Sequence, residues 1–116
     1  MNGSILDDIK KLLGEPYDHF NTDIILHINT AFSVLNQLGV GPNTPFRITD
    51  SSSTWGDFTQ DINSYSLIKD IVYLRVKLIF DAPSNSFLVD EMKKELEELE
   101  WRAHVMFDRG STEEED

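Results

Sequence analysis

The side chains that most often carry out chemistry in proteins are absent or scattered in this sequence. Cysteine is missing, which excludes disulfides, thiolate nucleophiles and thiolate metal sites. Three histidines, His19, His27 and His104, have no spacing typical of metal ligands, so we interpret them as surface or partly buried side chains. The sequence contains no Gly-x-Ser-x-Gly turn, no His-Glu-x-x-His pair and no glycine-rich phosphate loop. It therefore predicts no enzyme, no metal site and no cofactor.

Acidic residues are plentiful, and they set the charge of the whole chain. A carboxylate pair works as acid and base only if one member is desolvated, and nothing in the sequence indicates such a pair. The net charge of −11 opposes binding to DNA phosphates. Removing the four acidic side chains of 113–116 still leaves −7, so the acidity is not only a property of the tail. Two interpretations stay open: the charge serves solubility and self-repulsion, or it keeps DNA from adhering to the surface.

One apolar helix is expected to organise the other elements. In the stretch 64–80, apolar residues cover more than one face of a helix, and charged residues are confined to Lys69, Asp70, Arg75 and Lys77. These charges also interrupt the run before it is long enough to cross a bilayer, so no membrane segment is expected. The first residues lack the basic start and apolar middle of a signal peptide. The apolar helix must be covered on several sides, by this chain or by a partner.

Cap and stop signals predict three further helices, two before the apolar helix and one after it. The predicted N-terminal caps are Ser4, Asn21 or Thr22, and Ser86. The predicted ends of the first two helices are Gly14, followed by Pro16, and Gly39. The expected fold is mainly α, a bundle of about four helices around the central apolar helix, with a short β-hairpin or long loop between the second and third helices.

The last helix carries one apolar seam at spacings of three and four residues, and this seam is expected to pack on another helix. Its members are Leu88, Met92, Leu96, Leu99, Ala103 and Met106. From Gly110 the composition predicts a disordered acidic tail. We therefore expect one domain over 1–109 and a tail over 110–116.

The segment between the second and third helices breaks the helical pattern with glycine, proline and serine. Phe46 and Ile48 alternate with polar residues, and a second short extended piece would carry Trp55 and Phe58. A small hairpin turning near 50–53 is therefore predicted. Because an isolated hairpin is marginal in water, Trp55 and Phe58 must anchor it, either on this chain's own helices or on a neighbouring subunit.

Four stretches follow one another along nearly the whole chain: Asp-Ile-Lys-Lys-Leu-Leu-Gly at 8–14, the second-helix run 28–42, Thr-Trp-Gly-Asp-Phe at 54–58, and Leu-Ile-Phe-Asp-Ala-Pro at 78–83 before an acidic final helix. In their order and spacing, the sequence resembles the head-tail connector proteins of tailed phages.

The resemblance implies a helical bundle that assembles as a homo-oligomeric ring of about a dozen copies below the portal, extends the DNA channel and meets a tail or stopper protein. It implies a structural role with no catalytic residue, DNA that passes without specific binding, and a place at the virion neck after synthesis in the host cytoplasm. On this sequence the contact loop would be 46–58, and the final helix with its tail would lie toward the portal. The candidate contact residues are Phe46, Ile48, Trp55, Phe58, Arg75 and Trp101.

A second function class stays open beside this one. A small acidic regulatory or DNA-mimic protein would bind a basic partner through its carboxylates, and its complex would weaken steeply with salt. Such a protein would be a monomer or a dimer, so the size of the assembly distinguishes it from a ring-forming connector.

Overall fold

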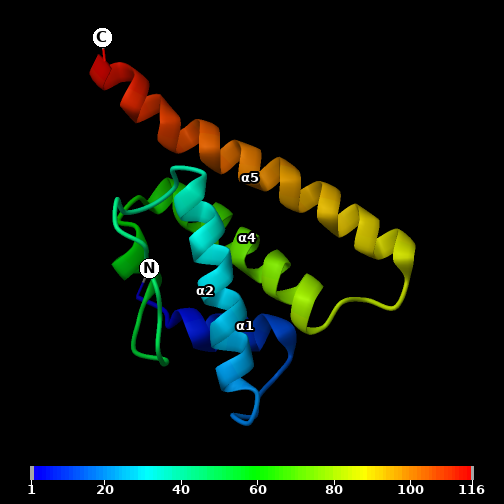
Figure 1. Ribbon diagram of the computed structural model, residues 1–116. Helices are drawn as coiled ribbons and strands as arrows, with labels where there is room; N and C mark the ends of the chain where they lie inside the picture. The colour runs from blue at the N-terminus through cyan, green and yellow to red at the C-terminus, as the bar shows by residue number, and fades with distance from the viewer. Residues whose placement is uncertain (1, 116) are drawn as a thin grey trace.

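The computed structural model describes the backbone of residues 2–115 and the side chains of residues 2–107. Within these limits the chain is mainly helical, as predicted, and contains no strand (Figure 1). The helices are α1 (Ile5–Leu13), α2 (Asn21–Gln37), α3 (Trp55–Phe58), α4 (Ile62–Phe80) and α5 (Ser86–Glu115). No helix in the described part of the chain combines the length and apolar character needed to cross a bilayer.

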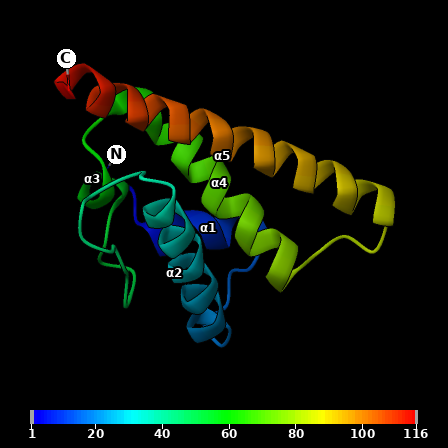
Figure 2. The same ribbon diagram turned by 45° about the horizontal axis from the view of Figure 1, so that its top comes forward.

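Helix α4 is the predicted central helix, and three other helices pack against it. Figure 2 shows α4 between α5 on one side and α1 and α2 on the other. Its residues Ile68, Ile71, Val72 and Val76 are completely buried. These four lie at i, i+3, i+4 and i+8 and form one face, whereas Leu74, which is also buried, points away from that face. A single neighbouring helix could therefore not cover them all.

The boundaries of α1 follow the predicted chemistry. The Ser4 hydroxyl accepts a hydrogen bond from the backbone N–H of Asp7 at 3.2 Å, which satisfies one of the free amides of the first turn. Gly14 ends the helix with φ of 74°, a left-handed conformation that glycine adopts without steric cost.

The predicted caps of α2 and α5 are wrong. Phe20 occupies the N-cap position of α2 without any side-chain cap, and Asn21 is already the first helical residue. Asn85 caps α5, because its side-chain oxygen accepts hydrogen bonds from the amides of Phe87 at 2.8 Å and Leu88 at 3.3 Å. Ser86 is inside the helix, one residue too late to act as the cap.

For the segment between α2 and α4 the sequence predicts either a short β-hairpin or a long loop. The hairpin prediction is wrong, because the structure has the long loop. Its second half folds into α3 instead of a strand, because Asp57 accepts a hydrogen bond from the amide of Thr54 at 2.8 Å and closes a capping box. In its first half, Asn29 of α2 takes the place of a partner strand. The amide of Ile48 donates to Asn29 Oδ1 at 2.8 Å, and Asn29 Nδ2 donates to the Ile48 carbonyl at 3.0 Å.

The end of this loop is tied to the N-terminal segment. Ser4 and Thr54 form an isolated antiparallel bridge, and the amide of Ile5 donates to the carbonyl of Ser53 at 3.0 Å. The start of α1 and the start of α3 are therefore held together, although they are far apart in sequence.

The apolar seam of α5 is shorter than predicted. Leu96 and Ala103 are buried, and Met92 and Leu99 pack against the core. The outermost members of the predicted seam, Leu88 and Met106, are exposed. Both ends of α5 extend past the bundle in Figure 1, so α4 covers only its middle.

The backbone of α5 continues to Glu115, where the sequence predicts a disordered tail from 110. Asp116 lies outside the described residues. The division into a domain over 1–109 and a tail over 110–116 stays a prediction.

Candidate functional site

Three of the six predicted contact residues are in the interior of this chain. Trp55 is 0% exposed, and Ile48 and Phe58 are also buried. The Trp55 indole N–H donates to Asp8 Oδ2 of α1 at 2.8 Å. Trp55 and Phe58 thus pack on this chain's own helices and not on a neighbouring subunit. Their side chains therefore present almost no surface to a neighbour in this conformation.

Phe46 is half-buried and holds the first half of the loop against the core. Its ring centroid lies 4.9 Å from that of Phe32 and 5.3 Å from that of Phe58, both at edge-on angles. Arg47, the next residue, is exposed. Residues 46 and 48 thus point inward and residue 47 points outward, as in an extended segment.

Arg75 and Trp101 lie close to the contact between α4 and α5, with different exposures. The Arg75 guanidinium donates to Glu100 and joins the two helices. Trp101 is 64% exposed, which is unusual for so large an apolar side chain. Contact of Phe46, Arg75 or Trp101 with another subunit stays a prediction.

Trp101 stands between two shallow hollows on α5. On one side, a hollow of about 340 Å³, here called the Trp101 hollow, is lined by Leu38, Glu97, Glu100, Trp101 and His104. On the other side a similar hollow is lined by Trp101, Arg102, Val105 and Met106. Val105 and Met106 are exposed as well. Residues 101–106 of α5 therefore present an apolar face that nothing in the described chain covers.

The polar side chains of the Trp101 hollow are two carboxylates and one imidazole. His104 Nδ1 lies 2.8 Å from the Leu38 carbonyl, and because a carbonyl only accepts, Nδ1 donates this hydrogen bond. Glu97 is exposed and belongs to no ion pair within residues 2–107, whereas Glu100 is held by Arg75.

A second group of side chains, here called the Tyr17 cluster, consists of four neighbouring rings at the other end of α2, of which Tyr17, His19 and Phe20 are exposed and Phe80 is half-buried. Neighbouring ring centroids lie 5.8 Å apart for Tyr17 and His19, 4.5 Å for His19 and Phe20, and 5.5 Å for Phe20 and Phe80. Leu38 follows the last residue of α2, and Phe20 precedes its first. Since α2 has 17 residues, the Tyr17 cluster and the Trp101 hollow are separated by about 25 Å along the helix.

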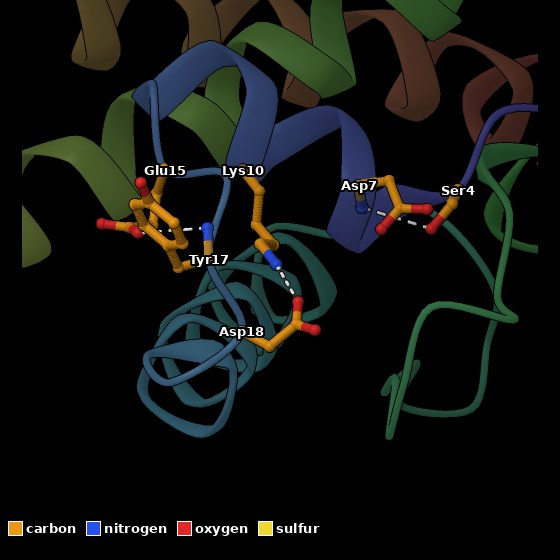
Figure 3. Close-up of polar contacts among 6 residues, drawn as sticks. All are labelled: Ser4, Asp7, Lys10, Glu15, Tyr17 and Asp18. Carbon is orange, nitrogen blue, oxygen red and sulfur yellow. Dashed lines mark hydrogen bonds and ion pairs between the residues drawn. The ribbon is translucent and has the colours of Figure 1, made fainter.

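A hollow of about 530 Å³ lies beside α1, where it meets the turn into α2. Figure 3 shows Lys10 directed at Asp18, with Nζ and Oδ1 2.7 Å apart, and Glu15 beside Tyr17. Lys10 is buried although it is charged, because Asp18 provides a counter-charge at the surface. The hollow has no nucleophile with an adjacent base, so we assign it no chemistry.

Among the described residues, no three side chains of His, Asp and Glu come together as a possible metal site.

Comparison with known proteins gives a direct result for the family. The model of the family described as "Phage connector protein" matches residues 5–110, which include every helix from α1 to α4 and most of α5. The chain belongs to the phage connector protein family. Comparison with curated proteins and with solved structures finds no match.

As a member of this family, the connector is a structural phage protein that contacts other head or tail components in the virion. This agrees with its surface. Aromatic and aliphatic side chains gather at exposed positions around Trp101 and in the Tyr17 cluster, and aromatic residues are enriched at protein contacts.

Sequence reasoning missed two features of the connector's surface and loop. Asn29 stands on the buried face of α2 between Ile28 and Phe32, and a lone amide on such a face is the one signal that could have indicated a buried polar partner. The Trp101 hollow depends on Leu38 and His104, which are 66 residues apart, and no local pattern joins them.

The ion pair beside α1 predicts a pH dependence of the connector's stability. The pKa of Asp18 is lowered, because Lys10 donates a hydrogen bond to it and adds a positive charge. A carboxyl with a lowered pKa stabilises the folded state above its unfolded value of 3.8 and loses this effect as the pH falls through the lowered pKa. The difference in unfolding free energy between wild type and Asp18→Asn should therefore be constant above about pH 5 and shrink toward zero in acid.

Asp50→Asn is the matched control for this measurement. The pKa of Asp50 is lowered by the Ser52 hydroxyl and amide, with no cation involved. Urea unfolding at several pH values should show, for both variants, that the difference in unfolding free energy from wild type shrinks in acid. Added salt should reduce the effect of Asp18→Asn and leave that of Asp50→Asn unchanged, because salt screens the exposed ion pair. A salt-independent Asp18 effect would contradict a role for the Lys10 charge.

Proposed function

We propose that this connector assembles into a closed ring at the virion neck, between the portal and the next tail or stopper component, and encloses the channel through which DNA passes. The observation that carries the proposal is the family match over residues 5–110. The proposed partners are other copies of the chain, the portal and a tail component.

The distribution of exposed apolar side chains supports more than one protein contact. The Tyr17 cluster and the face around Trp101 lie at opposite ends of α2. A closed ring needs two different surfaces on each subunit, because head-to-tail contacts join unlike patches. A chain with one apolar patch would favour a simple dimer instead.

The charge supports a channel to which DNA does not adhere. Between residues 90 and 98 of α5, five carboxylate side chains are exposed: Asp90, Glu91, Glu95, Glu97 and Glu98. Together with the net charge of −11, they raise the cost of bringing phosphates close.

Native mass spectrometry of the purified connector over a range of concentrations tests the proposal. We expect a closed ring of about a dozen copies, and no nanomolar binding of duplex DNA at physiological salt. A monomer that also fails to bind portal protein would contradict the proposal and favour the acidic mimic. That protein should bind a basic partner with an affinity that falls steeply with salt.

A further inference from the structure

The Trp101 hollow has a composition that selects its occupant. Its apolar surface comes from Leu38 and Trp101, and its hydrogen-bond acceptors include the carboxylates of Glu97 and Glu100. A group that fits must bring hydrogen-bond donors, positive charge and an apolar stem. Arginine and lysine side chains meet these conditions, and an arginine can also stack on the indole ring and donate two parallel hydrogen bonds to a carboxylate.

Most cations of this chain already have a carboxylate partner. Within residues 2–107, the cations outside any ion pair are Lys11, Arg47 and Lys93. Lys93 is on α5, the same helix as the hollow. Lys11 shares its own hollow with Asp7 and Glu15. Arg47 is exposed, and it is the arginine that remains available to a neighbour among the described residues.

Arg47 is presented outward by two anchored neighbours. Phe46 packs edge-on against Phe32 and Phe58, and Ile48 is held by both hydrogen bonds from Asn29. The backbone at residue 47 is therefore ordered before any partner arrives. Such preorganisation lowers the entropy lost on binding.

We infer that Arg47 of one copy docks in the Trp101 hollow of a neighbouring copy, with its guanidinium against Trp101 and Glu97. The inference rests on the proposed ring and specifies a subunit contact within it. The contact joins the loop after α2 to the outer face of α5, so it is a head-to-tail contact between unlike surfaces.

A charge exchange between the two sides tests this contact. Arg47→Glu and Glu97→Arg should each weaken self-association at least about tenfold, measured by sedimentation velocity and native mass spectrometry. The double variant R47E/E97R should recover most of the loss, because it restores opposite charges in reversed positions. Trp101→Ala should weaken association as well, and circular dichroism should show unchanged helix content in every variant.

Lys93→Glu is the matched control, since it changes the net charge as Arg47→Glu does at a cation outside the hollow. It should leave association within about twofold of wild type. If all variants assemble like wild type, the docking inference is overturned while the ring stands. If the wild-type protein is monomeric at every concentration, the contact between free copies is also overturned, and binding to portal protein then decides the connector function separately.

Discussion

Replacing Trp55 by Ala is expected to lower the free energy of unfolding by about 3–5 kcal/mol, the usual cost of removing a fully buried large aromatic side chain. Trp55 is 0% exposed, packs edge-on against Tyr65, and donates its indole N–H to Asp8. Since small domains are stable by about 5–15 kcal/mol, such a loss should leave the fold marginal. Urea unfolding followed by circular dichroism measures it.

Two variants separate the parts of this effect. Trp55→Phe keeps most of the packing and leaves Asp8 without the indole donor, so it should cost less than Trp55→Ala. Trp101→Ala removes the same side chain type from an exposed position and should change stability by no more than about 0.5 kcal/mol. If Trp55→Ala keeps wild-type stability and loses only assembly, Trp55 is a subunit contact and its burial described here is wrong.

Replacing Asn29 by Ala is expected to cost about 2–4 kcal/mol, because it leaves two buried backbone groups of Ile48 without partners. The amide and the carbonyl of Ile48 are both bonded to the Asn29 side chain, at 2.8 and 3.0 Å. The loop should then detach from α2. Increased proteolysis between α2 and α3, together with the unfolding free energy, reports this.

Asn36→Ala is the control on the same helix. Asn36 donates one long hydrogen bond, of 3.4 Å, to the carbonyl of Pro42 and is only half-buried. Its removal should cost less than about 1 kcal/mol. Equal effects at the two positions would show that the paired hydrogen bonds to Ile48 add nothing to stability.

The helices of this connector were predictable because their signals are local. Ser4 and Gly14 set the two ends of α1 through contacts with residues three or four positions away. The apolar faces of α4 require neighbours on several sides, whichever elements supply them. Both features act within one element. Periodicity and cap chemistry are therefore sufficient to find them.

The loop was not predictable in the same way, because distant residues decide its shape. The alternation around Phe46 and Ile48 is correct for an extended segment, but the partner of that segment is the side chain of Asn29 and not a second strand. Thr54 and Asp57 then favour a helical turn over the strand that Trp55 and Phe58 suggest. Aromatic residues in a strand-like pattern are equally suited to a short helix whose ends are capped.

Contact with another subunit stays a prediction for the candidate residues, and the structure shows only how exposed each one is. Exposed Trp101 and half-buried Phe46 remain available as contact residues, whereas Ile48, Trp55 and Phe58 are core residues. Composition marks all of them as large and apolar. Only the three-dimensional arrangement shows which of them a neighbour can reach.

The bond between Trp55 and Asp8, which joins residues 47 positions apart, bears on how the chain folds. Helices α4 and α5 are joined by a short connection, so they can pair early. Bringing α1 to the loop costs more conformational entropy, because it closes a long segment of chain. We therefore expect docking of the N-terminal segment to be a late step that follows the main folding barrier. Substitutions at the Ser4 and Thr54 bridge should therefore shorten the lifetime of the native state and leave the folding rate nearly unchanged.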